Sequence, residues 1–319
     1  MRKIIVLDGY AANPGDFNWD GLTQLGECTI YDRTANNEIL DRIKDAEIIL
    51  TNKTPITATT IEQSPHLKYI GVIATGYNIV DIEAAKKRGI VVTNIPAYST
   101  NSVAQLTFAH LLNIAQRVQT HSDEVKKGRW SSHVDFTFWD TPLIELFGQK
   151  MGIIGLGNTG MATAKIALGF GLTVCAYTSK KQDELPQGIE KIELNDLFKT
   201  CDIISLHCPL NSKTQGMINK ESLSLMKPNA ILLNTARGGL INEKDLADAL
   251  NNNQIYAAGI DVLTEEPPQA DNPLIATKNC FITPHFAWAS FSARERLMKI
   301  LLANIKAYID GAPINNVAQ

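Results

Sequence analysis

The sequence predicts an α/β protein built from two doubly wound domains with parallel sheets. The chain has 319 residues, which is about two domains of roughly 150 residues each. Short β-branched runs alternate with helical patterns along almost the whole chain, and this alternation is typical of parallel sheets covered by helices on both faces. The composition, 45% hydrophobic and 20% charged, is that of a folded globular protein.

The candidate strands form two series separated by a long helical stretch. Helical patterns such as Glu38–Lys44 and Asp81–Arg88 connect the strands of the first series. The strands are, in order, Lys3–Leu7, Glu47–Leu50, Tyr69–Ile73 and Val91–Thr93, then Met151–Ile154, Thr173–Tyr177, Ile203–Leu206, Ala230–Leu233, Ala257–Asp261 and Cys280–Ile282.

Two long helices are predicted to connect the domains. The first runs from Ser102 to about Lys127, with Ser102 and Gln105 as a capping-box pair and Lys126-Lys127-Gly128 as a stop. Its apolar stripe has helical spacing and consists of Val103, Leu106, Leu111, Leu112, Ala115 and Val118. The second helix runs from about Ser290 to Ile309. We therefore expect one domain of residues 1–100 plus 286–319, and an inserted domain of residues 101–285.

The segment Arg129–Gly148 fits neither series of strands. It carries many large apolar side chains without a regular period. Such an apolar arm needs something to cover it. The sequence pattern leaves two alternatives open, packing on its own domain or contact with a second subunit.

A glycine-rich turn predicts a dinucleotide-binding site of the Rossmann type. The strand Met151–Ile154 leads into Gly155-Leu156-Gly157-Asn158-Thr159-Gly160, and a helical pattern follows. This motif alone is weak evidence, but here it has the required strand–turn–helix context. Gly155 permits the tight turn, Gly157 lets the backbone approach a pyrophosphate, and Gly160 allows close helix–strand packing. The helix N-terminus, with Asn158 and Thr159, presents N–H groups to the anion.

The segment after the next strand bears on the choice of cofactor. It reads Tyr177-Thr178-Ser179-Lys180-Lys181, so no carboxylate stands where NAD-binding domains usually carry one for the ribose hydroxyls. Small hydroxyl residues and two lysines could hold a 2′-phosphate, which favours NADP. The alternative is a solvated lysine pair on a surface turn, and the sequence leaves the choice between NAD and NADP open.

Three further segments bring polar side chains to the carboxyl ends of strands. Arg237 lies in the segment 234–239, Glu266 in 261–268 and His285 in 283–288. Ligands of open α/β sheets bind at the carboxyl ends of the strands, so we expect the three groups to converge beside the nicotinamide. Each group alone would usually be structural, but three complementary groups on successive strand ends predict a catalytic site.

The chemistry of these three groups fits the reduction of a 2-oxo acid. Arg237 offers a permanently charged, bidentate donor for the carboxylate and the keto oxygen. His285 can serve as the general acid in reduction and as the general base in the reverse direction. Glu266 can hydrogen-bond the other ring nitrogen, orient the imidazole and stabilise the imidazolium. No Ser-His-Asp order, H-E-x-x-H motif or Walker loop competes with this interpretation.

Composition and charge argue against several other classes of function. The formal net charge is −3 and there is no basic stripe, which argues against a nucleic-acid ligand. The apolar runs are of strand length, far short of the roughly 20 residues of a membrane span, and the run after Met1 is too short for a signal peptide. Five scattered cysteines without a C-x-x-C pair favour reduced thiols in the cytoplasm and no metal site.

The sequence resembles the D-isomer-specific 2-hydroxyacid dehydrogenases, and within them the glycerate dehydrogenase (hydroxypyruvate reductase) branch. The resemblance covers nearly the whole chain. It rests on the glycine motif, on the segments that contain Arg237, Glu266 and His285, and on residues 74–81, 89–94 and 102–105. Residues 135–140 and 286–290 point to the glycerate branch.

The resemblance implies a flavodoxin-like substrate domain and roles for individual residues. Arg237, Glu266 and His285 would form the catalytic trio, and Asp261 would lie near the nicotinamide carboxamide. The remaining implied cofactor contacts are His207, Cys208, Pro209, Thr235 and Ala236. The implied substrate contacts are Thr75, Gly76 and Tyr77, together with Lys53, which matches a cationic position in some members and is otherwise a plain surface lysine.

The resemblance also implies a homodimer that forms through the arm 129–148. Other functions remain possible, namely a short 3-phosphoglycerate dehydrogenase or a non-catalytic NAD(H)-sensing binding protein. A sensing protein would need a partner-binding extension, and we expect none because the predicted elements begin at Lys3 and end shortly before Gln319. The sequence does not select the preferred 2-oxo acid.

Overall fold

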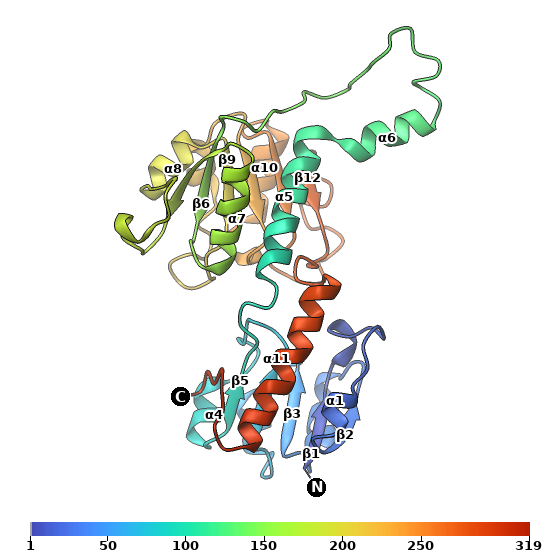
Figure 1. Ribbon diagram of the computed structural model, residues 1–319, viewed down its shortest axis with the longest axis vertical. Coiled ribbons are helices and arrows are strands. Elements are labelled where there is room, and N and C mark those ends of the chain that lie inside the picture. The colour runs from blue at the N-terminus through green and yellow to red at the C-terminus, as the bar shows by residue number, and fades with distance from the viewer. Residues whose placement is uncertain (1) are drawn as a thin grey trace. The chain divides into compact units, whose positions relative to one another are not determined.

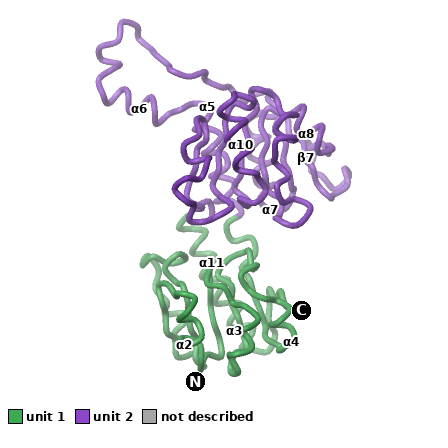
Figure 2. The backbone as a smooth tube through the Cα atoms, turned by 180° about the vertical axis from the view of Figure 1, so that it is seen from behind, with its two compact units in different colours: residues 1–99, 289–319 green, residues 100–288 purple. Residues whose placement is uncertain are grey.

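The computed structural model describes residues 2–319, and the chain forms two compact units (Figure 2). Unit 1 comprises residues up to Ser99 together with Ala289–Gln319, and unit 2 comprises Thr100–Trp288. The sequence places the domain boundaries after residues 100 and 285, and the structure places them after residues 99 and 288. Each unit contains one sheet, and all strand pairs in both sheets are parallel.

Unit 1 has a five-stranded sheet in the order β2-β1-β3-β4-β5, which is the flavodoxin-like order. The sequence did not predict β2, because this edge strand is only half-buried on one face and exposed on the other, so it carries no continuous apolar run. The elements are β1 (Lys3–Val6), α1 (Asp20–Thr23), β2 (Glu27–Ile30), α2 (Ile39–Ile43), β3 (Ile48–Thr51), α3 (Ala58–Glu62), β4 (Tyr69–Val72), α4 (Ile82–Lys87), β5 (Val91–Thr93) and α11 (Phe291–Ile309) (Figure 1).

Unit 2 has a seven-stranded sheet in the order β12-β11-β10-β9-β6-β7-β8. This is the Rossmann order extended by one strand. The edge strand β8 was not predicted, since its three residues include a single hydrophobic one, Ile189. The elements are α5 (Thr100–Gln116), α6 (Val118–Lys126), β6 (Lys150–Ile154), α7 (Asn158–Gly169), β7 (Thr173–Tyr177), β8 (Ile189–Lys191), α8 (Leu194–Thr200), β9 (Ile203–Leu206), α9 (Lys220–Leu225), β10 (Ile231–Asn234), α10 (Glu243–Asn251), β11 (Ala257–Ile260) and β12 (Cys280–Ile282).

The sheet of unit 2 is covered on both faces, as its nearly continuous apolar strands require. Successive strand residues point to opposite faces, so Ile153 packs into the cluster under α5 and α7, whereas Ile154 packs into the cluster under α8, α9 and α10. Ile203 and Ile204 of β9 divide in the same way. Both layers together fix the strand ends on which the polar segments lie.

The helix predicted over residues 102–127 is in fact two helices, so that prediction was wrong. Arg117 adopts a left-handed conformation with φ +48° and ends α5 before α6 begins. No residue of α6 is buried, so the apolar stripe has no core to face beyond the break, and Val118 is exposed. Because α5 begins at Thr100, Ser102 does not cap it; instead its hydroxyl donates a 2.6 Å hydrogen bond to the Ala287 carbonyl.

After α6, the segment up to residue 148 extends away from the sheet of unit 2 (Figures 1 and 2). It contains no helix or strand. Most of its large apolar side chains are exposed, with Val134 at 98% and Phe136 at 88% of their full accessibility, whereas Ile144 and Leu146 near its end pack into the core of unit 2. This is the apolar arm that the sequence singled out. Across residues 2–319, no helix combines the length and the apolar character needed to cross a bilayer.

Candidate functional site

The glycine motif forms a sharp turn between β6 and α7. Gly155 has φ +93°, and a Cβ placed on it would lie 2.6 Å from the backbone nitrogen of Cys208. A Cβ on Gly160 would lie 2.1 Å from the carbonyl oxygen of Gly155. Both positions therefore require glycine, the first for its conformation and its contact with the loop after β9, the second for close packing of the helix on the turn.

Gly157 differs from the other two glycines, because a Cβ placed on it would meet no atom within 4 Å. It is the N-cap residue of α7, and no side chain caps that helix. The first N–H groups of α7, from Asn158 onwards, therefore have no side-chain acceptor and combine with the positive end of the helix dipole. The open backbone at Gly157 and these amides fit the pyrophosphate of a dinucleotide.

The loop after β9 lies against the glycine turn. The N–H of His207 donates to the Ile154 carbonyl at 2.8 Å, and its Nε2 lies 2.8 Å from the Ser205 hydroxyl. Burial lowers the pKa of His207 to about 4, so its imidazole is neutral near pH 7 and adds no charge to the site. Cys208 is buried and Pro209 is exposed. The structure thus brings residues 207–209 to the edge predicted to bind the cofactor.

The segment after β7 gathers cationic side chains. Lys180 is half-buried, and its N–H donates to the Thr178 hydroxyl at 3.3 Å. Lys191 of β8, which the sequence interpretation did not include, places its ammonium 2.8 Å from the Lys180 carbonyl. Ser179 is exposed, and the Glu184 carboxylate accepts the N–H of Lys181 at 2.6 Å. The edge at the end of β7 therefore carries three lysines, with the acids Asp183, Glu184 and Glu190 in the same segments.

Glu266 and His285 meet in the structure. The Nδ1 atom of His285 lies 2.5 Å from Oε2 of Glu266, and both side chains remain about one-third exposed. The other carboxylate oxygen of Glu266 accepts the Leu263 N–H at 3.0 Å. This geometry leaves Nε2 of His285 as the ring nitrogen available for a proton exchange.

Arg237 lies on the neighbouring loop after β10. Its side chain is exposed, with Nη1 donating to the Ala236 carbonyl at 2.6 Å. The following Gly238 packs against the loop that carries Glu266, since a Cβ there would lie 2.0 Å from the carbonyl carbon of Leu263. The loops that carry Arg237, Glu266 and His285 are thus joined in a continuous series of contacts at the carboxyl ends of adjacent strands.

Asp261 is buried behind the loop that carries His285, with 1% of its surface exposed. Its Oδ1 accepts hydrogen bonds from the Thr283 hydroxyl at 2.6 Å and the Phe286 N–H at 3.1 Å, and its Oδ2 accepts the Ala287 N–H at 2.9 Å. Burial raises the pKa of this carboxyl above its usual value, while the bonds from Thr283 and Ala287 oppose that shift. The contacts of this carboxylate in the structure are thus to residues of the His285 loop.

Helix α5 supports two of these loops through polar side chains that sequence reasoning missed. The hydroxyl of Thr107 lies 2.9 Å from that of Thr235, which immediately precedes Ala236 and Arg237. One helical turn later, Nε2 of His110 lies 3.0 Å from the Thr283 hydroxyl. The signal was present in the sequence, because two polar residues three positions apart interrupt an otherwise apolar helix face.

The other residues expected to contact the substrate, besides Arg237 and His285, lie in unit 1. Lys53 is exposed and follows β3, and its loop is held by Asp8, whose carboxylate accepts the N–H groups of Asn52, Lys53 and Thr54 at 2.6–2.7 Å. Asp8 follows β1, so this clamp lies where the strand order 2-1-3-4-5 changes direction, a place where ligands of such folds bind.

The loop that contains Thr75, Gly76 and Tyr77 follows β4 in the same unit. The Thr75 hydroxyl donates to the Ile95 carbonyl at 2.8 Å, and the Asn94 amide donates to the Thr75 carbonyl at 2.8 Å. Tyr77 is exposed. In the described residues 2–319, no three His, Cys, Asp or Glu side chains gather as a metal-binding group.

The chain is similar to a known protein family and to proteins of known structure along most of its length. Residues 108–287 match the family described as D-isomer specific 2-hydroxyacid dehydrogenase, NAD binding domain. The chain is 49% identical to a hydroxypyruvate reductase of Blautia hydrogenotrophica and 39% identical to a glycerate dehydrogenase of Methylorubrum extorquens, over 99% of both chains in each case. It also resembles the structure of an acyclic imino acid reductase in complex with NADPH and D-Arg, with a TM-score of 0.86 and 33% identity over 99% of both chains.

Substitution of Gly157 by alanine is expected to weaken dinucleotide binding without unfolding the protein. The new methyl group meets no protein atom, so the free energy of unfolding should change by less than about 1 kcal/mol, but it occupies the approach of the pyrophosphate. We expect the Kd for NAD(P)H, measured by fluorescence titration, to rise about tenfold or more. Gly169→Ala, at the other end of α7 and equally free of contacts, is the matched control. Equal affinity of both variants would contradict the assignment.

Proposed function

The chain belongs to the D-isomer-specific 2-hydroxyacid dehydrogenase family, and on that premise we propose that it reduces short 2-oxo acids to D-2-hydroxy acids with NAD(P)H, preferring hydroxypyruvate or glyoxylate. The observation that carries the proposal is the 2.5 Å contact between Nδ1 of His285 and Oε2 of Glu266. Similarity to a hydroxypyruvate reductase and a glycerate dehydrogenase along 99% of the chain supports the choice of substrate. Unit 2 is assigned as the dinucleotide-binding domain and unit 1 as the substrate domain.

Different groups of the site bind the cofactor and the substrate in the proposed reduction. The amides at the start of α7 and the backbone at Gly157 would hold the pyrophosphate, and Thr235, Ala236 and Asp261 would lie along the nicotinamide. When bound, NAD(P)H supplies the hydride that reduces the carbonyl carbon. Arg237 binds the carboxylate and the keto oxygen of the substrate and stabilises the negative charge that develops on that oxygen.

His285 transfers the proton. Its Nε2 donates a proton to the substrate oxygen as the carbonyl is reduced, and takes it back in the oxidative direction. Glu266 accepts a hydrogen bond from Nδ1–H, which fixes the orientation of the ring and stabilises its protonated form before the transfer. The exposure of both side chains allows the histidine to be reprotonated from solvent after each turnover.

Residues of unit 1 complete the proposed assignment. We assign the backbone amides around Gly76 and Tyr77, together with Thr75, to the substrate carboxylate, and Lys53 to the polar end of the substrate. The clamp by Asp8 supports a role for Lys53, because a loop whose three N–H groups are held by one buried carboxylate keeps its side chain at a fixed place.

A steady-state comparison of substrates and cofactors tests the function. Purified protein is assayed with hydroxypyruvate, glyoxylate, pyruvate and phosphohydroxypyruvate, each with NADH and with NADPH. We expect hydroxypyruvate or glyoxylate to give the highest kcat/KM, and NADPH to be preferred over NADH. The preference for NADPH rests on Thr178 in place of an acid and on the lysines at positions 180, 181 and 191. Absence of NAD(P)H oxidation with every acid would refute the function, and highest kcat/KM with phosphohydroxypyruvate would favour a phosphoglycerate dehydrogenase.

Replacing Glu266 by glutamine should slow the reduction. An amide cannot form the charge-assisted hydrogen bond with which a carboxylate holds the imidazole of His285, so kcat/KM for the best 2-oxo acid should fall about tenfold or more. The measurement is steady-state kcat/KM at saturating NAD(P)H. Glu265→Gln, the neighbouring exposed carboxylate on the same loop, should leave kcat/KM within about twofold of wild type. Equal values for the two variants would mean that Glu266 does not position the histidine.

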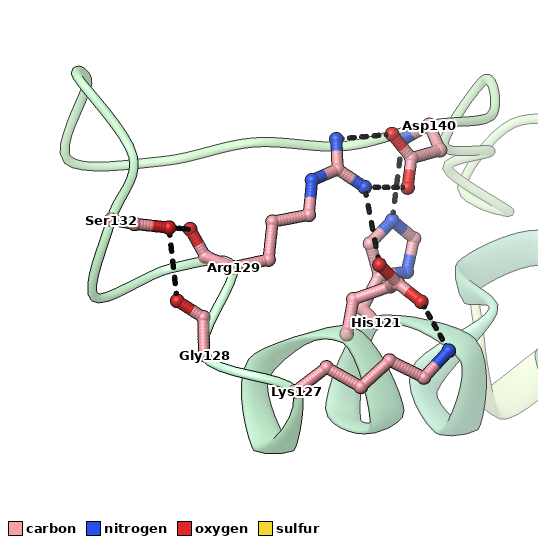
Figure 3. A network of polar contacts seen from close by, with 7 residues as sticks. His121, Lys127, Gly128, Arg129, Ser132 and Asp140 are labelled. Carbon is pink, nitrogen blue, oxygen red and sulfur yellow. Dashed lines mark hydrogen bonds and ion pairs between the residues drawn. The ribbon is translucent and has the colours of Figure 1, made fainter.

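The protein is further proposed to be a cytoplasmic homodimer that forms through α6 and the arm 129–148. The arm is held at its base by polar contacts (Figure 3). Arg129 makes a bidentate pair with Asp140 at 2.5 and 2.7 Å, and its guanidinium keeps the pKa of the Asp140 carboxyl below its usual value. Lys127 pairs with Glu124 at 2.7 Å. A fixed base with exposed aromatic side chains beyond it favours contact with a second copy over a mobile loop.

Changing Phe136 to glutamate tests the interface. The wild-type protein should sediment with twice the chain mass of 35.0 kDa, and the variant should shift towards the single-chain mass, because burial of a charge in an apolar contact is unfavourable. Ile275→Glu, which alters an exposed apolar residue of unit 2 outside the arm, should remain dimeric. A monomeric wild type, or dissociation of both variants, would refute the assignment of the interface to the arm.

A further inference from the structure

A buried chain of hydrogen bonds runs from helix α5 to the loop that carries His285. It starts at His110, which is 4% exposed and lies on the face of α5 that packs on β11. The contact is so close that a Cβ on Gly259 of β11 would lie 2.7 Å from the Cβ of His110. From there the chain passes through the Thr283 hydroxyl to the Asp261 carboxylate, with steps of 3.0 and 2.6 Å.

The direction of these bonds follows from the number of hydrogens available. The hydroxyl of Thr283 has one hydrogen, and it is donated to Oδ1 of Asp261. Nε2 of His110 must then be the donor to the Thr283 oxygen. Burial lowers the pKa of His110 to about 4, so near neutral pH its ring is uncharged and carries its single proton on Nε2. Each polar group in this hydrogen-bond chain is therefore assigned as donor or acceptor.

Asp261 in turn holds the backbone around His285 through hydrogen bonds. Its carboxylate accepts the N–H groups of Phe286 and Ala287, and its carbonyl accepts the N–H of His285 at 2.8 Å. His285 itself has φ +50°, a left-handed conformation that is unfavourable for a residue with a side chain and persists only where its surroundings impose it. The bonds to Asp261 supply such surroundings.

We infer that His110 is a positioning residue for the general acid. Through the Thr283 hydroxyl it fixes the Asp261 carboxylate, and Asp261 fixes the backbone that aims His285 at Glu266 and at the substrate. This inference rests on the proposed reductase function. If it is correct, His110 of α5 affects the rate of proton transfer although it does not contact the substrate.

Two pairs of variants test the role of the chain. His110→Leu and Thr283→Val remove the donor and the hydroxyl, whereas His110→Gln and Thr283→Ser retain a donor and a hydroxyl at about the same reach. We expect the first pair to lower kcat for the best 2-oxo acid about tenfold, with KM for NAD(P)H within about twofold, and the second pair to recover most of that loss. The double variant His110→Leu/Thr283→Val should lose no more than Thr283→Val alone, because both act through one chain.

A control variant and a measurement that does not depend on turnover distinguish an effect on the position of His285 from an effect on stability. Thr277→Val removes a hydroxyl from another buried threonine of unit 2, which donates to the Pro273 carbonyl, and should leave kcat within about twofold of wild type. The proton on Nδ1 of His285 should give a downfield NMR signal that shifts or broadens in His110→Leu and Thr283→Val but not in Thr277→Val.

These measurements distinguish failure of this inference from failure of the proposed function. A wild-type protein without reductase activity would refute the function, while the NMR comparison would still show whether His110 controls the setting of His285. If His110→Leu and Thr283→Val lower only the Tm, and kcat and the His285 signal remain unchanged, the inference is overturned. If either variant fails to fold, its retained-donor counterpart decides, since a full loss of kcat in a folded His110→Gln or Thr283→Ser would also contradict it.

Discussion

The parallel arrangement of the sheet in unit 2 is the constraint on which the site depends. Because all its strands run in the same direction, the ends of β6, β9, β10, β11 and β12 lie at one edge, and each following loop begins there. The glycine turn, the arginine loop and the histidine loop are separated by up to about 130 residues in sequence, yet they become neighbours for this reason. The apolar layers on both faces keep that edge in place.

Buried carboxylates play the same part in both units. Asp8 follows β1 and accepts three backbone N–H groups of the loop after β3, and Asp261 follows β11 and accepts two from the loop after β12. In each case a short acidic residue at one strand end organises the backbone at the next strand end. A buried charge is tolerated because several donors surround it. The two buried carboxylates thereby hold the loops whose side chains, Lys53 and His285, reach solvent.

Helix α5 supports the loops of the site and also connects, through α6, to the arm. Up to Gln116 it is packed on the sheet, where Thr107 and His110 contact the loops next to Arg237 and His285. At Arg117 the chain turns through a left-handed residue, and α6 leads into the arm. The guanidinium of Arg117 lies over the ring of Phe281 at 4.2 Å and donates to Asn279, so the break is anchored to the strand that precedes the histidine loop.

The sequence alone determined the fold class, the family resemblance and most strands, because parallel strands buried on both faces read as apolar runs and the glycine motif has a fixed geometric context. It could not show β2 and β8, whose edge positions need few apolar residues, or the break at Arg117, which depends on where the sheet ends beneath the helix. The contact between Glu266 and His285 was expected from residue types. The chain from His110 through Thr283 to Asp261 joins residues up to 173 positions apart, and only tertiary packing could bring those groups within hydrogen-bonding distance.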